Sequence, residues 1–238
     1  MSASGGIPTL DAVILDVDGT LVDSERDGHR VAFNAAFEAL DLPWRWDVEE
    51  YGRLLAVTGG RSRLDAYLQE QGVSGDERTD LVPRLHQCKT EAFLDLVASG
   101  AVQPRPGVAG FLDRVEAAGL RLAVATTGSL AWVEPLLELH FGRARFEVVV
   151  GGDDVKQTKP DPAAYLVALD RLGLEPTEAV AVEDSVPGLG AARAAGVPCV
   201  VVPNDYTRAQ DFSGAALVAG SFQDLEVQAL RRLVGGRG

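Results

Sequence analysis

The stretch AVILDVDGTL, residues 12–21, decides the fold class of this chain. Its first four residues are apolar without alternation, which is typical of a strand that helices cover on both faces. Two carboxylates then follow two positions apart, and because side chains alternate along an extended backbone, Asp16 and Asp18 can face one site. Taken alone, the same letters fit a strand-end turn capped by an aspartate equally well. The other strand ends of the chain therefore decide between the two interpretations.

Four further short runs rich in β-branched residues predict strands at residues 121–125, 147–150, 179–182 and 198–202. The segments that follow the first three of these runs predict helices at residues 130–139, 162–172 and 188–195. Alternation of strand and helix predicts a parallel sheet. We therefore expect a doubly wound, Rossmann-like α/β core, in which ligands bind beyond the carboxyl ends of the strands.

Between residues 24 and 100 the pattern changes, because no buried strand is visible and helical signals dominate. Capping boxes predict helix starts at Ser24 with Asp27 and at Asp47 with Glu50. Further helices are predicted at residues 64–71 and 76–98, with Pro83 as a kink or an early boundary. These signals predict a helical unit inserted into the α/β core.

The expected domains follow from this change of pattern. Residues 1–24 and 103–238 are expected to form the α/β core, and residues 25–102 an inserted α-helical cap domain. Residues 2–6 are expected to form a mobile end.

Composition excludes several classes of protein. The 238 residues include 22 basic and 35 acidic side chains, so the net charge of −13 argues against duplex nucleic acid as a partner. Two cysteines, Cys88 and Cys199, are too few for a disulfide framework and fit a reducing cytosol. No run approaches the roughly 18 apolar residues of a membrane span, and no targeting segment is visible. We expect a cytoplasmic monomer without a membrane partner.

Polar groups follow three of the other predicted strands. The run TTGS at residues 126–129 offers hydroxyls and backbone N–H groups to a phosphoryl oxygen, Lys159 precedes a helix that begins with proline, and Glu183 and Asp184 end another strand. Each segment alone also fits a simple helix cap. Chance capping does not supply the single lysine, so we interpret the four strand ends as one shared site.

This set of groups predicts phosphoryl chemistry. Four carboxylates at one sheet edge need a cation, and hard oxygen ligands with room for water and phosphate suit Mg²⁺. Phosphoryl transfer needs neutralised oxygens, an in-line nucleophile and an acid for the leaving oxygen. Asp16, Asp18, Lys159 and Mg²⁺ fit these requirements.

In order and spacing, the four segments resemble the haloacid dehalogenase superfamily, in its phosphatase and phosphomutase branch, over about residues 12–224. The resemblance implies that Asp16 attacks phosphorus to form an aspartyl-phosphate, and that Asp18 protonates the leaving alcohol and then activates water. It further implies that Lys159 orients the nucleophile and the phosphate.

The same resemblance assigns the remaining groups of the core. Thr126 is expected to bind the phosphoryl group, with Thr127 and Gly128 beside it contacting the substrate, although many relatives have a hydroxyl or an asparagine in place of Gly128. Glu183 and Asp184 are expected to hold Mg²⁺ together with Asp16 and Asp18, the last through its backbone carbonyl.

The predicted cap domain resembles that of a narrower group, the CbbY-like proteins, which include xylulose-1,5-bisphosphate phosphatases. The matching segments are DSERDGHR at residues 23–30, WD at 46–47 followed by Tyr51, TGGRSR at 58–63 and KTE at 89–91. This resemblance implies that the cap recognises a phosphorylated sugar.

The cap residues also make physical sense as a second recognition surface. Gly59 and Gly60 permit close backbone approach to a ligand, and positive charge comes from three nearby cap residues, Arg61, Arg63 and Lys89. Glu25 and His29 lie one helical turn apart and could bind sugar hydroxyls. Solvated helix charges and a buried structural histidine explain the same residues. Because the whole chain is acidic, an anionic substrate needs at least some of this positive charge.

We therefore predict a Mg²⁺-dependent sugar phosphate phosphatase that acts through an aspartyl-phosphate, with a ketose bisphosphate such as xylulose-1,5-bisphosphate as its substrate. The nearest alternative is a β-phosphoglucomutase, which shares the core motifs and returns the phosphoryl group to the sugar. A phosphate-binding regulatory protein that kept the fold is the alternative outside enzymes. The sequence assigns no role to residues 204–220.

Overall fold

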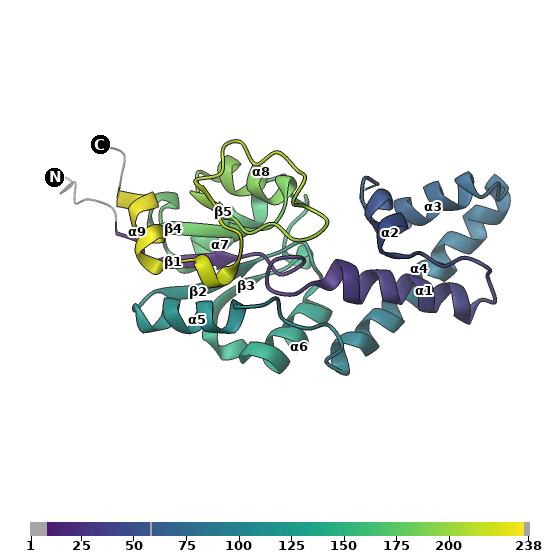
Figure 1. The fold of residues 1–238 in the computed structure, drawn as a ribbon, viewed down its shortest axis with the longest axis horizontal. Coiled ribbons are helices and arrows are strands. Elements are labelled where there is room, and N and C mark those ends of the chain that lie inside the picture. Colours follow the sequence, from purple (N-terminus) through teal and green to yellow (C-terminus); the bar gives the residue numbers. More distant parts are fainter. Residues whose placement is uncertain (1–8, 58, 236–238) are drawn as a thin grey trace. The chain divides into compact units, whose positions relative to one another are not determined.

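A computed structural model describes residues 9–57 and 59–235 of the chain, and the expected mobile end at residues 2–6 lies outside them. The chain divides into two compact units (Figure 1). The first comprises Met1–Asp23 and Pro104–Gly238, and we call it the core unit. The second, Ser24–Gln103, is the helical unit. The boundaries expected from the sequence differ from these by one residue at each junction.

The described part of the core unit contains a parallel sheet with strand order β3-β2-β1-β4-β5-β6. Its strands are β1 (Ala12–Leu15), β2 (Arg121–Ala125), β3 (Phe146–Val150), β4 (Ala179–Glu183), β5 (Cys199–Val201) and β6 (Leu217–Val218). The first five lie where the apolar runs predict them, and the expected Rossmann-like sheet is confirmed. β6 has only two residues and is additional to the prediction.

The strand order reverses its direction at β1. The chain moves from β1 outward through β2 to β3, and then returns to place β4 on the opposite side of β1. Ligands of doubly wound sheets bind at such a switch point, beyond the carboxyl ends of the strands. The fold therefore predicts a site at the ends of β1 and β4.

Helices cover both faces of this sheet. They are α5 (Val108–Ala117), α6 (Leu130–Phe141), α7 (Ala163–Leu172), α8 (Val186–Ala194) and α9 (Val227–Gly235). Figure 1 shows α5 and α6 on one side of the strands and α8 on the other. The predicted helices at residues 130–139, 162–172 and 188–195 are confirmed to within two residues, whereas α5 and α9 are additional to the prediction. Single-turn 3₁₀ helices occupy Arg143–Arg145, Gly152–Asp154, Pro176–Glu178 and Phe222–Asp224.

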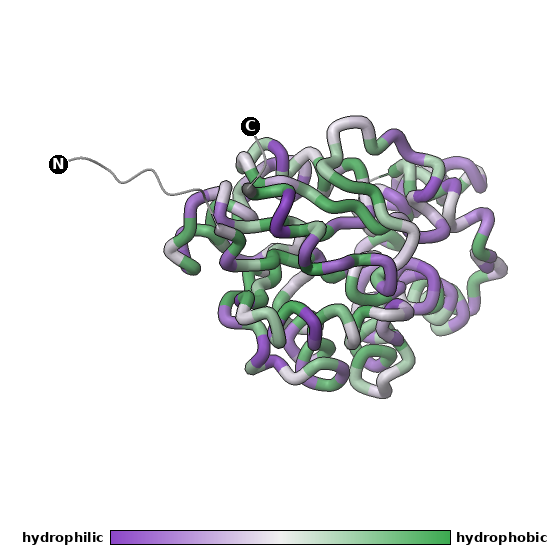
Figure 2. The backbone as a smooth tube through the Cα atoms, turned by 60° about the vertical axis from the view of Figure 1, so that its left-hand side comes forward, coloured by the Kyte–Doolittle hydropathy of each residue, from purple (hydrophilic) through white to green (hydrophobic). Residues whose placement is uncertain are grey.

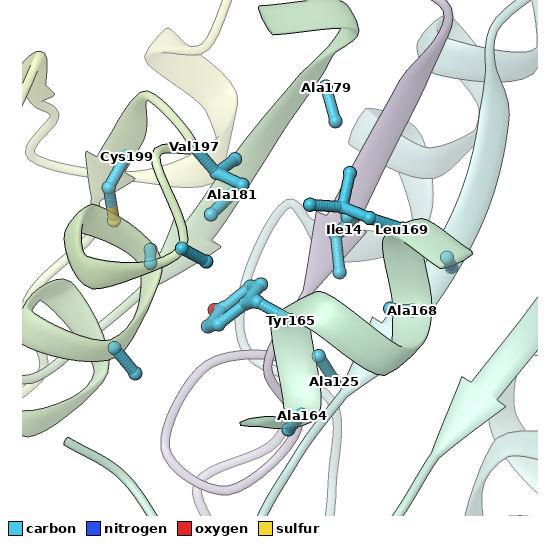
Figure 3. Close-up of a cluster of buried hydrophobic side chains, with 14 of the residues drawn as sticks. Ile14, Ala125, Ala164, Tyr165, Ala168, Leu169, Ala179, Ala181, Val197 and Cys199 are labelled. Carbon is cyan, nitrogen blue, oxygen red and sulfur yellow. The ribbon is translucent and has the colours of Figure 1, made fainter. Parts of the chain in front are cut away.

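One face of the sheet is packed by small side chains. Alternate residues of the strands, such as Ile14 and Ala181, contact α7 and α8 through Ala168, Leu169 and Ala192. The small residues bring the helices close to the sheet, and burial of each larger side chain contributes roughly 1.5–3 kcal/mol. Figure 3 shows the Tyr165 ring within this apolar cluster.

The helical unit is built around aromatic side chains. It contains a π-helical turn (Glu25–His29) and the helices α1 (Arg30–Ala39), α2 (Val48–Leu54), α3 (Gly60–Glu70) and α4 (Gly75–Ala98). Trp46 lies at the centre, with the rings of Phe33 and Tyr67 at centroid distances of 4.7 and 5.0 Å. The predicted capping bond from Glu50 N to Asp47 Oδ1 is present at 2.8 Å.

In this unit the capping box at Ser24 is wrong, and of the two alternatives for Pro83, a kink or an early boundary, the boundary is wrong. Ser24 does not cap the first helix with its side chain, because the chain begins there with a π-helical turn. In that turn a Cβ on Gly28 would lie 2.7 Å from the Phe93 ring, so packing sets the local path. Pro83 does not end a helix, because α4 continues through it. Packing of α4 against α1 and α3 outweighs the local preference.

None of the helices among the described residues is long and apolar enough to cross a lipid bilayer. Figure 2 shows short hydrophobic stretches of backbone interrupted by hydrophilic ones.

Candidate active site

A buried lysine joins two strand ends of the core unit. The Lys159 ammonium lies 2.6 Å from Asp16 Oδ1, just beyond β1, and 2.6 Å from Glu183 Oε1, at the end of β4. The exposed fractions of the three side chains are 6%, 6% and 1%. Breaking such a buried pair by removing one partner costs about 3–5 kcal/mol. The contact brings together three residues that the sequence places far apart.

The Glu183 carboxylate is held from two further sides. The buried Tyr165 hydroxyl donates a hydrogen bond of 2.6 Å to Glu183 Oε1. On another side the backbone of α8 passes so close that a Cβ on Gly188 would lie 1.9 Å from Glu183 Oε2. Only glycine fits at this position while the carboxylate keeps its place. Glu183 is therefore fixed by hydrogen bonding and by shape.

Asp184 is fixed by the loops that follow β1 and β5. Asn204 Nδ2 donates to Asp184 Oδ2 at 2.7 Å, and the Thr20 hydroxyl lies 3.4 Å from Asp184 Oδ1. Gly19 has a φ of +83°, and a Cβ there would lie 2.6 Å from Asp184 Oδ2. The glycine of the Asp-x-Asp-Gly segment thus serves both the turn and the close approach of the carboxylate.

Burial and mutual repulsion perturb these carboxylates. Burial raises the pKa of Asp16 to about 7, with Lys159 opposing the rise and Glu183 adding to it. Burial, followed by the charges of Asp16 and Glu183, raises the pKa of Asp184 well above its ordinary value. Burial alone would lower the pKa of Lys159, but Asp16 and Glu183 raise it above its ordinary value. The lysine therefore stays charged beside a surplus of negative charge.

The carboxylates fit a divalent cation. Ligand oxygens of Asp16, Glu183 and Asp184 lie within 4.8 Å of one another, and all three residues are buried. Three acidic groups against one ammonium leave an excess of negative charge that a hard cation would neutralise. Burial is the main cause of the raised pKa values of Asp16 and Asp184, and the charges of the neighbouring carboxylates add to the rise. The site can hold a metal ion of the Mg²⁺ type.

The loop after β2 forms a separate part of the site. Thr126 is buried, and its hydroxyl oxygen accepts a hydrogen bond of 3.1 Å from Gly128 N, which leaves its own proton for another acceptor. Asp153 accepts hydrogen bonds from the Ser129 hydroxyl at 2.8 Å and from Leu130 N at 2.9 Å. Ser129 Oγ also accepts from Ala131 N at 3.3 Å, so the loop caps the start of α6 as expected. Thr127 is exposed and Gly128 is buried.

In the helical unit, two of the predicted substrate residues belong to a buried network. The Tyr51 hydroxyl donates a short hydrogen bond to Glu25, and Arg63 Nη1 donates to the Tyr51 oxygen at 3.0 Å. Arg63 Nε also donates to the Leu54 carbonyl at 3.2 Å, and only 7% of Arg63 is exposed. The contacts of Arg63 hold α2 and α3 together.

The other predicted residues of the helical unit form a second group. Lys89 Nζ lies 3.0 Å from His29 Nδ1 and 4.9 Å from the centre of the Phe93 ring. Gly59 has a φ of +88° and is exposed, as is Arg61, and Gly60 is half-buried. Thr58, the first residue of the TGGRSR segment, lies outside the described residues.

Three polar residues of the core site are missing from the sequence prediction: Asn204, Tyr165 and Asp153. Asn204 follows β5 as the other site groups follow their strands, so the strand-end rule could have found it. Tyr165 sits among apolar residues of α7 and is hidden by that helix pattern. Asp153 lies in a loop whose contact with residues 128–130 is made only by folding.

The fold and the site together define a class of protein. Residues 10–196 match the family described as haloacid dehalogenase-like hydrolase. The chain therefore belongs to the haloacid dehalogenase-like hydrolases, and the expected family membership is confirmed.

Within that family the chain is similar to CbbY proteins. It is 45% identical to Protein CbbY of Cereibacter sphaeroides over 219 residues, which cover 91% of this chain and 94% of that protein. The crystal structure of CbbY from Rhodobacter sphaeroides in complex with phosphate has a TM-score of 0.81 at 44% identity, covering 93% and 99% of the two chains. A second structure from that organism, an aspartate-to-asparagine variant of CbbY in complex with xylulose-(1,5)bisphosphate, has a TM-score of 0.79 at 42% identity and the same coverage.

Proposed function

We propose that this protein is a sugar phosphate phosphatase in which Asp16 is the nucleophile. The observation that carries the proposal is the Lys159 ammonium held 2.6 Å from both Asp16 and Glu183 at the switch point of the sheet. A buried carboxylate oriented by an ammonium is suited to attack phosphorus, because its lone pairs are directed and bulk water is excluded.

In the first step, an Asp16 oxygen attacks phosphorus while the bond from phosphorus to the sugar oxygen breaks. Asp18 gives its proton to the leaving oxygen, so the products are a free sugar hydroxyl and an aspartyl-phosphate. Lys159 and the Thr126 hydroxyl stabilise the negative charge on the phosphoryl oxygens, with Thr127 and Gly128 lining the substrate.

In the second step, Asp18, now ionised, takes a proton from water. The resulting hydroxide attacks phosphorus, the bond to Asp16 breaks, and inorganic phosphate leaves with Asp16 restored as a carboxylate. Asp18 returns to its protonated form, so the cycle balances. Half-burial of Asp18 suits a group that must exchange its proton with substrate and water.

The proposed cofactor is Mg²⁺. Asp16, Glu183, Asp184 and the backbone carbonyl of Asp18 would hold it, and it would neutralise the phosphoryl oxygens. The cluster of buried carboxylates supports this assignment.

The proposed substrate is a ketose bisphosphate such as xylulose-1,5-bisphosphate. Similarity to a CbbY structure that contains this compound supports the choice. The positive charges of Arg61 and Lys89 would attract the second phosphate. Gly59 and Gly60, which have no side chains, would allow the phosphate to approach the backbone closely. Glu25 and His29 would bind the sugar hydroxyls, and Arg63, which donates to the Glu25 partner Tyr51, would support Glu25.

Phosphate release from a panel of sugar phosphates tests the proposal. The panel contains xylulose-1,5-bisphosphate, ribulose-1,5-bisphosphate and β-glucose-1-phosphate, each with and without Mg²⁺. We expect Mg²⁺-dependent release with preference for the xylulose bisphosphate. Conversion of β-glucose-1-phosphate to glucose-6-phosphate without phosphate release would instead identify a mutase. Binding without any turnover would indicate a regulatory protein.

A further inference from the structure

Arg105 is a half-buried arginine at the start of the segment that leads into α5, and the proposed chemistry does not use it. Its guanidinium donates three hydrogen bonds, all to backbone carbonyls. Nη1 donates to Gly19 O at 2.7 Å and to Val202 O at 2.8 Å, and Nη2 donates to Pro203 O at 2.8 Å. The Arg105 backbone N–H adds a bond of 2.9 Å to Leu21 O.

These acceptors lie in two loops at the carboxyl edge of the sheet. Gly19 and Leu21 belong to the loop after β1, directly beyond Asp18, whereas Val202 and Pro203 follow β5. In the sheet, β4 lies between β1 and β5, and Asp184 stands at its end. One guanidinium therefore links the two loops that flank the Asp184 carboxylate.

Asn204 extends this link to the carboxylate itself. It directly follows Pro203, and its side-chain oxygen accepts from Tyr206 N at 2.9 Å and Thr207 N at 3.1 Å. Those two bonds direct Nδ2 the other way, where it donates to Asp184 Oδ2 at 2.7 Å and to Gly19 O at 3.2 Å. Gly19 O thus receives donors from both Arg105 and Asn204.

Burial of an arginine for such contacts has a cost. Burial lowers the pKa of Arg105, and the charges of Asp184, Asp23 and Asp205 oppose this. A neutral side chain could fill the same space without the desolvation penalty. The planar fork of arginine provides what a neutral side chain cannot, namely several fixed donors to acceptors on separate loops.

We propose that Arg105 is a positioning residue for the active site: through Gly19 and Asn204 it fixes the Asp18 loop and the Asp184 carboxylate relative to each other. The inference rests on the proposed function, since it takes Asp184 as a metal ligand. Groups that orient a metal-bound carboxylate typically change metal affinity or activity by about 10-fold to 100-fold when they are removed.

The substitution Arg105→Lys tests the role of the fork, because it keeps the positive charge near Asp184. A single ammonium replaces donors that two guanidinium nitrogens supply to three carbonyls. Arg114→Lys is the matched control. Arg114 also donates to two backbone carbonyls of the core unit, Phe222 O at 2.9 Å and Leu225 O at 3.3 Å, and neither belongs to the proposed site.

Mg²⁺ affinity is measured by titration calorimetry on full-length protein freed of metal with EDTA, at a temperature where the melting curves show every variant folded. We expect the Kd for Mg²⁺ to rise about 10-fold in Arg105→Lys and kcat to fall with it, while KM for the sugar phosphate stays within about 2-fold. Arg114→Lys is expected to lower Tm and to keep the wild-type Kd. A wild-type Kd in folded Arg105→Lys would overturn the inference.

Asn204→Ala serves as a second variant if Arg105→Lys does not fold. It removes the amide contacts to Asp184 and Gly19, and we again expect weaker Mg²⁺ binding. Thr207→Ala is its control, because the Thr207 hydroxyl accepts from Asn204 N at 2.9 Å and thus supports the same loop without contacting Asp184. Equal affinities in Asn204→Ala and Thr207→Ala would contradict the positioning role.

Asp184→Asn separates the two hypotheses. If this variant loses Mg²⁺ binding while Arg105→Lys and Asn204→Ala keep it, the inference fails and the proposed function stands. If the wild-type protein neither binds Mg²⁺ nor releases phosphate, both fail.

Discussion

The two units of this protein treat buried charge in opposite ways. In the core unit, the Lys159 ammonium contacts the carboxylates of Asp16 and Glu183. A third carboxylate, that of Asp184, has an oxygen within 4.8 Å of theirs. In the helical unit, the buried Arg63 donates to a carbonyl and to a tyrosine hydroxyl. The first arrangement concentrates like charge, whereas the second disperses a single charge over polar acceptors.

This difference distinguishes charged residues placed for catalysis from charged residues that stabilise the fold. A group of like charges in a dry site is unfavourable for folding and raises the pKa of its members, so its presence points to a function that needs it. Arg63 is satisfied by acceptors within the helical unit, and its contacts stabilise the packing of α2 against α3. Variants of the core cluster should therefore change activity more than stability, and variants of the buried Arg63 should change stability more than activity.

The largest effect is expected for Asp16→Asn. The amide keeps the size of the side chain but removes the nucleophilic carboxylate, so kcat should fall by about 10⁴-fold or more. Phosphate release from the best substrate measures the loss, and circular dichroism checks the fold. Substantial activity in a folded Asp16→Asn variant would show that the core cluster does not supply the nucleophile.

The next effect concerns stability and pH in metal-free protein. The pKa of Asp16 is about 7 when folded, against an ordinary value of 3.8, so across this interval the folded protein holds a proton that the unfolded chain has released. The free energy of unfolding should therefore fall as pH rises from about 4 to about 7. Denaturant titrations in EDTA measure the fall, and Mg²⁺ should reverse it at the upper end.

Asp16→Asn sharpens this test, because it removes the titrating group. Its stability should fall less than that of the wild type over the same interval, with Asp184 accounting for the part that remains. Parallel curves for the two proteins would contradict the pKa assigned to Asp16.

Arg61→Ala should act on substrate binding alone. Arg61 is exposed on α3, and loss of one charge-assisted contact to a second phosphate should raise KM for a ketose bisphosphate about 10-fold with kcat unchanged. Arg84, another exposed arginine of the helical unit, provides the control as Arg84→Ala. Equal KM values for the two variants would remove Arg61 from the proposed recognition surface.

The smallest effect is expected for Arg53→Ala. Arg53 pairs with Glu50 and Glu70 at 2.9 and 2.6 Å, but its side chain is half exposed, and such pairs contribute little in water. Tm should fall by no more than about 2 °C, with kcat and KM unchanged. Loss of activity here would mean that the helical unit couples its surface charges to the chemistry.

The core site can be predicted from the sequence more fully than the packing of the helical unit. Asp16, Lys159 and Glu183 come together because each lies near the carboxyl end of a strand, and strand ends are visible as the limits of apolar runs. Arg105 carries no such signal. The strand-end rule places Asn204 near the site but does not predict its contacts, which, like those of Arg105, reach Gly19 from 185 and 86 positions away. Their roles depend on loop paths that only the folded chain defines.

In the helical unit, local rules were less reliable. The predicted cap at Asp47 is present as a bond from Glu50 N to the Asp47 side chain, but the one at Ser24 is replaced by a π-helical turn. Close packing of Gly28 against the Phe93 ring and of α4 against α1 and α3 decides these segments, and such packing cannot be seen in the local sequence.

Direct detection of the phosphorylated aspartate tests the central claim most directly. Asp18→Ala should slow hydrolysis of the intermediate by roughly 10²-fold to 10⁴-fold, because the group that activates water is gone. After acid quenching of this variant with substrate and Mg²⁺, peptide mass spectrometry should find one added phosphoryl group on Asp16. A phosphoryl group on another residue, or none during measurable turnover, would contradict the account.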